Sequence, residues 1–350
     1  MVPVPLLTSL RQQAFALTIG LIGGVVAWSI NMPLAWMLGP MIACTIAALA
    51  QLPIRAPTRL RPFVMPVIGV LLGSRISADV LQSALGWIPA VLILIPFLIL
   101  TAGTSFWFYR RVGGYDPPTA FFSAMPGGLT DMIIIGGAAG GDERRIALAH
   151  ATRVLIVICG VVLFYSQFLG VTSEAAQSTW VGMSALSFAD WVILSICAVL
   201  GVPLGTVIRL PAGQIMGPMI LSGIAHVAGI VTVAPPSLIV IVALWITGTI
   251  IGCRFVGSQL RDVGRDMCLG LVSSVLMIAI AVGFAVLVTW VSGTALSETF
   301  LAYSPGGVVE MSLLALAMGQ DVTYVTVLHL TRIFMVIFGA GFGYRIIAAR

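Results

Sequence analysis

The chain has 350 residues, of which 59% are hydrophobic and 8% are charged. Soluble domains carry about 25% charged residues, so this composition excludes a soluble globular protein. A mean hydropathy of +1.12 places most side chains in lipid or in protein buried within lipid. The net charge of +5 comes from 17 arginines without a lysine. They lie singly or in small groups between apolar runs, as in cytoplasmic loops, which argues against nucleic acid as a partner.

Apolar segments follow one another along the whole chain, and a helix needs about 20 apolar residues to cross the bilayer core. The first half contains segments at 14–31, 33–51, 62–75, 84–108, 119–140 and 146–170. The second half contains segments at 188–208, 212–232, 236–253, 267–291, 299–319 and 322–344. We expect the first segment to be a retained span, because no small-residue cleavage site precedes a soluble domain.

The two sets of segments repeat a common pattern. Pro126-Gly127-Gly128 recurs as Pro305-Gly306-Gly307 at an offset of 179 residues. The same offset relates Asp131 to Glu310, His150 to His329 and Arg153 to Arg332, and Gly39-Pro40 recurs as Gly217-Pro218, one residue out of step. Matched residues of these types indicate an internal duplication. The sequence therefore predicts a first membrane repeat over 1–171, a linker over 172–187 and a second repeat over 188–350.

The arginines predict how the halves are oriented. Were every segment a span, the halves would be parallel and the arginine-free linker cytoplasmic, against the positive-inside rule. If each Pro-Gly-Gly segment enters and leaves on one side, the second half is inverted. Nearly all arginines outside the membrane then become cytoplasmic: Arg11, Arg55, Arg59, Arg61, Arg110, Arg111, Arg144, Arg145, Arg209, Arg261, Arg265, Arg345 and Arg350, with Arg75 outside. We predict an all-α polytopic membrane protein of two homologous, inverted halves, each with about five spans and a broken or re-entrant helix.

The Pro-Gly-Gly motifs mark the predicted solute pathway. Pro126 removes a backbone donor, and Gly127 and Gly128 weaken the helix further; Pro305, Gly306 and Gly307 do the same in the second half. Lipid cannot satisfy the freed backbone groups, so each break is buried in protein or lines a wet cavity. Matching breaks in inverted halves point to a transporter's binding site. The alternative is a tight turn between two short helices that binds no ligand.

Charged residues recur beside both breaks. Asp131 and Glu310 each follow the proline by five residues, and Arg153 and Arg332 lie about two turns into the next helix. Because a charge at this depth needs a partner, we predict two ion pairs, Asp131 with Arg153 and Glu310 with Arg332. The pairs either line a substrate or proton pathway or hold the broken segment in place. His150 and His329 either relay protons or are satisfied buried histidines.

Two further sets of residues have simpler interpretations. Gly39, Pro40, Gly217 and Pro218 are predicted to kink the second span of each half and to let two backbones approach closely. The three histidines and few carboxylates form no metal-ligand cluster, and no nucleotide-binding or hydrolase motif stands in a suitable context. We therefore expect no metal, no cofactor and no catalytic activity.

Two recurring blocks resemble those of a known family. One is Met37-Leu38-Gly39-Pro40-Met41, and the other runs from Pro-Gly-Gly through Asp or Glu and Met to His-x-Thr-Arg. With its duplication, the chain resembles the bacterial AbrB-like membrane proteins over nearly its whole length. The resemblance implies a multi-pass protein of the bacterial inner (cytoplasmic) membrane. Family labels include ammonia monooxygenase and regulator of gene expression, but an oxygenase requires metal ligands that this sequence lacks.

The sequence favours secondary transport of a small solute, with a proton or a sodium ion as the coupling ion. The predicted partners are the lipid bilayer and this solute, and assembly into a homo-oligomer is left open. The alternative is a membrane-embedded sensor that alters gene expression indirectly, as the family's regulatory label implies. It predicts a cytoplasmic partner and no solute flux, whereas the predicted cytoplasmic loops are short.

Overall fold

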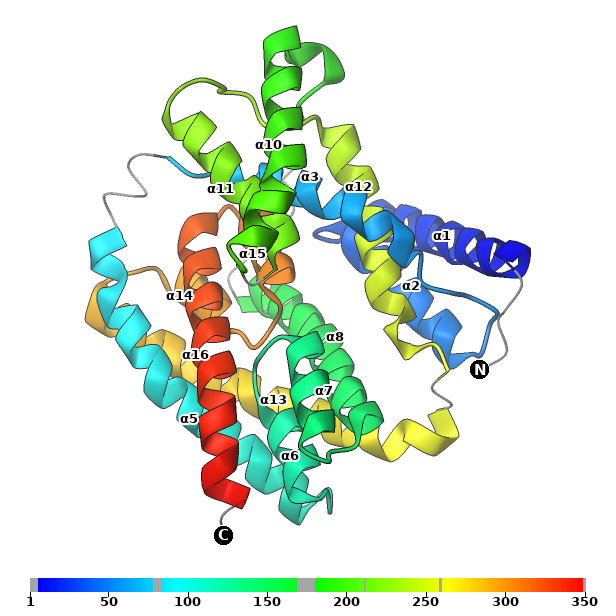
Figure 1. Ribbon diagram of the computed structural model, residues 1–350, viewed down its shortest axis with the longest axis vertical. Coiled ribbons are helices and arrows are strands. Elements are labelled where there is room, and N and C mark those ends of the chain that lie inside the picture. The colour runs from blue at the N-terminus through cyan, green and yellow to red at the C-terminus, as the bar shows by residue number, and fades with distance from the viewer. Residues whose placement is uncertain (1–5, 78–83, 169–179, 211, 258–259, 349–350) are drawn as a thin grey trace. The chain divides into compact units, whose positions relative to one another are not determined.

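The computed structural model describes residues 6–77, 84–168, 180–210, 212–257 and 260–348. Every regular element in these ranges is a helix (Figure 1). Seven helical segments are long and apolar enough to cross a membrane: Thr8–Ser29, Ala84–Arg111, Glu143–Tyr165, Phe188–Val207, Ser237–Phe255, Gly264–Ser292 and Val322–Ala340. The protein is thus an all-α, multi-pass membrane protein, as predicted. Residues 172–179 of the predicted linker and the side chains of Arg261, Arg345 and Arg350 lie outside the described part.

The chain divides into two compact units, and each unit takes segments from both predicted halves. Unit 1 comprises Met1–Leu81 and Thr172–Leu260, and unit 2 comprises Gln82–Val171 and Arg261–Arg350. The two compact units therefore do not coincide with the two predicted repeats. Both Pro-Gly-Gly motifs fall in unit 2.

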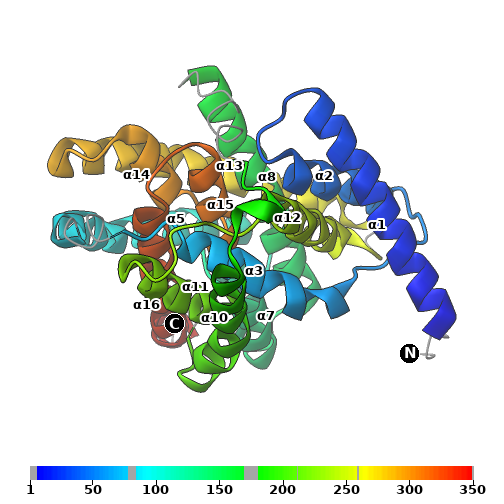
Figure 2. The ribbon, with the colours of Figure 1, turned by 90° about the horizontal axis from the view of Figure 1, so that it is seen from above.

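Unit 1 consists of helices that pack closely through glycine. Its helices are α1 Leu6–Ser29, α2 Ala35–Leu49, α3 Arg61–Gly73, α10 Phe188–Val207, α11 Gly213–Val227 and α12 Ser237–Gly252. Helix α1 lies beside α2 (Figure 2), and α10 packs on α11. Helix α3 packs on α11 and α12 packs on α2, so elements of the two halves interleave.

Three helices of unit 1 are short. Helices α2 and α11 have 15 residues each and α3 has 13. At about 1.5 Å per residue they measure about 20–22 Å, less than the bilayer core of about 30 Å. The ten-span count includes these helices and stays a prediction.

The predicted kink residues lie where two backbones meet. A Cβ on Gly39 would overlap the carbonyl oxygen of Gly23 in α1, and one on Gly217 would overlap that of Gly201 in α10. Helices α2 and α11 both continue through their prolines. These glycines therefore allow contact between helices at a distance that any side chain would prevent.

Unit 2 carries the two broken segments. Its helices are α5 Ile88–Arg111, α6 Pro117–Ala124, α7 Leu129–Ala138, α8 Glu143–Phe168, α13 Leu260–Ser292 (from Arg261 on), α14 Leu296–Tyr303, α15 Val308–Ala317 and α16 Val322–Ala348. The predicted segments 119–140 and 299–319 are each two short helices, because the proline and glycines interrupt them. Asp116 caps the first of these helices, its carboxylate accepting from the Thr119 backbone N–H at 3.1 Å.

Candidate functional site

Helices α6 and α7 contact each other and form a hairpin, here called hairpin 1. Near its start, the Thr119 hydroxyl accepts a 2.8 Å hydrogen bond from the backbone N–H of Asp142, which follows α7. Along the hairpin, a Cβ on Gly136 of α7 would lie 3.1 Å from the Cβ of Phe122 in α6. The two helices therefore run side by side in opposite directions. The chain enters and leaves at one end, the base, and turns at residues 125–128, the tip.

Helices α14 and α15 form hairpin 2, with its tip at residues 304–307. At its base, the Glu298 carboxylate lies close to the backbone of Asp321, which follows α15. This contact corresponds to that of Thr119 with Asp142 in hairpin 1, at the same 179-residue offset. The chain thus also enters and leaves hairpin 2 at one end.

The two hairpins open at opposite ends of unit 2. Helix α8 begins at Glu143, beside the base of hairpin 1. Tyr165, near the other end of α8, donates a hydrogen bond to the carbonyl of Ser297 at the base of hairpin 2. Because one helix connects the two bases, the tips point toward each other along the length of the unit.

Arginines gather at the end where hairpin 1 opens. Arg110 donates to the Tyr115 carbonyl at 2.6 Å, and Arg265 donates to the Gly113 carbonyl at 3.1 Å. Arg145 lies 3.6 Å from a carboxylate oxygen of Asp266. The sequence placed these three arginines on one side of the membrane, and the structure places them at one end of unit 2. That end is the one expected to face the cytoplasm.

Arg153 holds the tip of hairpin 1. Its Nη1 donates to the Met125 carbonyl at 2.8 Å and its Nη2 to the Gly127 carbonyl at 3.4 Å. These carbonyls lie on either side of Pro126, where the end of α6 leaves them without helical partners. The Arg153 side chain is 6% exposed. It therefore supplies, inside the protein, the donors that the broken helix has lost.

Arg332 makes the same contacts with hairpin 2. Its Nη1 donates to the Ser304 carbonyl at 2.6 Å and its Nη2 to the Gly306 carbonyl at 2.5 Å. In both hairpins the acceptors precede the arginine by 28 and 26 residues. Arg332 is 2% exposed. Each buried guanidinium thus binds the two carbonyls that flank a proline at a hairpin tip.

The two histidines differ. His150 Nε2 lies 2.9 Å from the Phe122 carbonyl, and its Nδ1 lies 2.8 Å from Nη2 of Arg153. Because Arg153 can only donate, the contacts fit a neutral ring that carries its proton on Nε2. Protonation of Nδ1 would remove its bond to Arg153. His329 is fully buried beside the backbone of Ala302, and neither of its ring nitrogens makes a hydrogen bond of standard geometry.

The predicted ion pairs are not formed. In the described part of unit 2, the carboxylates in ion pairs are Asp142 and Asp266, both with Arg145. Asp131 and Glu310 instead lie in the first turns of α7 and α15. The positive end of a helix dipole stabilises a carboxylate there. The guanidiniums bind backbone carbonyls because the helix break leaves those carbonyls unpaired at the same depth.

Each of these two carboxylates lies against the glycine that directly precedes its helix. A Cβ on Gly128 would lie 2.6 Å from Oδ2 of Asp131, and one on Gly307 would overlap Oε2 of Glu310. Asp131 is exposed, whereas Glu310 is 7% exposed. A side chain at the second glycine of either motif would therefore displace the carboxylate from its present position.

Both tips lie about halfway through the unit. Arg153 stands ten residues into α8 and Arg332 ten residues into α16. At about 1.5 Å per residue, each arginine lies about 15 Å along the axis from the start of its helix, which is half the thickness of the bilayer core. The tips, their arginines, the two histidines and the two carboxylates thus converge on the middle of unit 2.

The carbonyls of Met125 and Ser304 complete the site, and the sequence did not point to either residue. Every residue carries a carbonyl, so residue type gives no signal. The usable signal was positional: each residue directly precedes the proline of the break, and an arginine follows 28 residues later.

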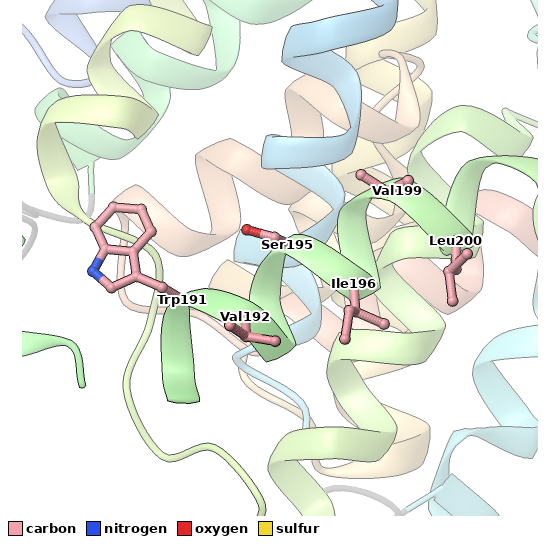
Figure 3. Close-up of a pocket in the computed structure, with 6 residues that line it drawn as sticks. All are labelled: Trp191, Val192, Ser195, Ile196, Val199 and Leu200. Atoms are coloured by element: carbon pink, nitrogen blue, oxygen red, sulfur yellow. The ribbon is translucent and has the colours of Figure 1, made fainter. Parts of the chain in front are cut away.

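Two apolar hollows are lined by residues other than those of the hairpin tips. One lies along α10 (Figure 3), lined by Trp191, Val192, Ser195, Ile196, Val199 and Leu200. The other is lined by Pro96, Ile99, Leu100, Gly103, Thr104, Trp107 and Leu276. Neither contains a charged group, so we assign them to the lipid-facing surface. Among the described residues, no group of three or more His, Cys, Asp or Glu side chains could hold a metal ion.

Comparison with known sequences identifies relatives that match most of the chain. Residues 36–348 match the family described as Transition state regulatory protein AbrB. A protein of Escherichia coli (strain K12) named "Putative regulator AbrB" is 24% identical over 310 residues, which cover 88% of each chain. "Uncharacterized protein YhjN" of Bacillus subtilis (strain 168) is 26% identical over 357 residues, which cover 94% of this chain and 91% of the relative.

Proposed function

The chain belongs to the AbrB family, and from this premise we propose that it is a secondary transporter for a small solute in the bacterial inner membrane. The two hairpin tips form its solute pathway. The observation that carries the proposal is the pair of buried arginines, each bound to the carbonyls of a break at the middle of unit 2. Broken helices in this position are typical of carriers, because lipid tolerates irregular backbone only where protein or water surrounds it.

The proposal includes the origin of the two hairpins. They derive from an internal duplication whose copies are inverted in the membrane, as in many secondary transporters. The matched spacing of Arg153 and Arg332 from their acceptors supports a common origin. The opening of the hairpins at opposite ends of unit 2 supports the inversion.

The arrangement fits a carrier in which one body holds the solute. Both tips belong to unit 2, so a solute bound between them would contact one compact unit. Asp131 and Glu310 would face the solute from the first turns of their helices, while the arginines hold the backbone of the tips in its conformation. No covalent chemistry is required, and we propose no enzymatic activity or cofactor.

Flux into vesicles tests the proposal. The purified chain is reconstituted and its uptake of labelled amino acids, carboxylates, sugars and ammonium is compared with that of the paired variant Arg153→Ala and Arg332→Ala. We expect uptake of at least one solute, lost in the paired variant and kept in Arg144→Ala, which changes an exposed arginine. Uptake that survives the paired change would contradict the assignment of the site. Equal uptake by all three proteins and by empty vesicles would contradict transport itself.

A second candidate follows from the name of the Escherichia coli relative, which contains the word regulator. In this candidate, the membrane protein senses a signal and alters gene expression indirectly through a cytoplasmic partner. It predicts stoichiometric capture of that partner by the full chain in membranes, without flux of any solute. Flux without a captured regulator favours the transporter.

A further inference from the structure

The carbonyls of the hairpin tips have the chemistry of a cation site. In carriers with broken helices, unwound carbonyls and the negative ends of half-helices coordinate the coupling cation. Each tip here presents two carbonyls that flank a proline: Met125 and Gly127 in hairpin 1, Ser304 and Gly306 in hairpin 2. All four are bound by a guanidinium of the chain itself.

We propose that Arg153 and Arg332 are built-in cations that occupy the sites a sodium ion would otherwise take, so that the protein works without sodium. This inference rests on the proposed transport function and narrows its coupling ion. The sequence leaves two candidates for the coupling ion, a proton and a sodium ion. Of these, a sodium ion bound at the hairpin tips is excluded. The positive charge that these carbonyls require is permanently part of the chain.

The occupancy of the tip carbonyls is the first argument. The guanidiniums lie 2.5 to 3.4 Å from the four oxygens and are 6% and 2% exposed. A sodium ion bound to the same oxygens would have to displace a buried, charge-assisted hydrogen-bond donor or lie directly beside it. The displaced guanidinium would then lose its acceptors at the middle of the membrane, where an unpaired charge is costly.

The local charge is the second argument. Each tip already holds one buried positive charge, Arg153 in hairpin 1 and Arg332 in hairpin 2. A second positive charge beside either guanidinium would add repulsion that the protein interior screens poorly. The nearby carboxylates do not neutralise the guanidiniums directly, since Asp131 and Glu310 form no ion pair with either arginine. A tip therefore becomes a cation site only after its arginine is removed.

Thermal unfolding of the detergent-solubilised full chain tests this without a known solute. Melting temperatures are compared in sodium chloride, choline chloride and methylguanidinium chloride at equal, moderate ionic strength. The wild type should melt at the same temperature in sodium and in choline. Arg332→Ala should melt about 5 °C or more lower in choline. It should regain at least half of this loss in sodium or methylguanidinium, because a small cation can enter the vacated carbonyl site.

Controls separate the outcomes. Arg144→Ala, which changes an exposed arginine, should respond to no salt. If Arg332→Ala does not fold, Arg332→Lys replaces it: the lysine keeps a cation near the tip, and its melting temperature should be the same in sodium and choline. A saturable stabilisation of the wild type by sodium overturns the inference, as does Arg332→Ala that no cation restores. Because unfolding needs no transported solute, these results hold even where the flux assay fails.

Discussion

Arg332 reaches back 28 residues to donate a 2.6 Å hydrogen bond to the carbonyl oxygen of Ser304. A charged side chain at this depth is expected to find either a carboxylate or a set of backbone carbonyls. Here it binds the carbonyls that a proline has left unpaired, and so it satisfies two requirements at once. The buried charge gains acceptors, and the broken helix gains donors.

The shape of the guanidinium leads to the first prediction. Arg332→Lys should destabilise the protein by about 1–2 kcal/mol and Arg332→Met by about 2–5 kcal/mol. An ammonium keeps the charge but lacks the planar fork that spans the Ser304 and Gly306 carbonyls. Methionine leaves both carbonyls unpaired. Chemical unfolding in detergent micelles measures both variants. Equal losses of stability in the two variants would show that a positive charge without the planar fork does not stabilise the tip.

Gly307 provides the second prediction. Its Cβ would overlap Oε2 of Glu310, so Gly307→Ala should displace this buried carboxylate from the first turn of α15. We expect at least a tenfold loss of solute uptake, since a displacement of about 1 Å can cost that much. Gly128→Ala should have a smaller effect, because Asp131 is exposed and can move.

The double variant Gly307→Ala with Glu310→Ala distinguishes two causes of that loss. If the methyl group acts by pushing the carboxylate, the double variant should fold as stably as Glu310→Ala alone. If it is less stable than Glu310→Ala, the methyl group disturbs the backbone of the tip instead. Unfolding temperature is the measurement.

The bounds of most helices could be predicted from the sequence because apolar runs and their end signals agree. The predicted segment 188–208 is α10, Phe188–Val207, where Ser187 and Asp190 form a capping box at the start. The break in each Pro-Gly-Gly segment was also predictable, since proline and glycine change the backbone itself. The sequence also placed a carboxylate, a histidine and an arginine near each break, because these residue types recur at the same offset of 179 residues.

The partners of these residues were not predictable. An offset between repeats shows which residues correspond, but not which side chains touch. Carboxylates were expected to pair with Arg153 and Arg332 because they are the conspicuous opposite charges. The acceptors are backbone carbonyls, which residue type does not reveal. The interleaving of the halves in each compact unit was missed as well, because it depends on packing between distant segments such as α3 and α11.

Close packing of glycine in unit 1 gives the third prediction. Gly217→Ala should destabilise the protein by about 1–3 kcal/mol, because its methyl group would overlap the Gly201 backbone, which cannot move aside as a flexible side chain can. Gly283→Ala in α13 is the matched control, since a Cβ there meets nothing within 4 Å. It should be neutral or slightly stabilising, because alanine favours a helix. Tolerance of both changes would mean that α10 and α11 can separate without cost.

The sidedness of the two hairpin bases gives the fourth prediction. Glu143 and Ala295 are exposed and lie at the opposite ends of unit 2, beside the bases of hairpins 1 and 2. From the arginines beside the first base, the positive-inside rule predicts that this base faces the cytoplasm. In a variant lacking the exposed native Cys268, Glu143→Cys should therefore resist a membrane-impermeant maleimide added to intact cells and react after permeabilisation. Ala295→Cys should react in intact cells. Labelling of both cysteines from the same side would rule out hairpins that enter from opposite faces of the membrane, and with them the inverted arrangement on which the transport pathway depends.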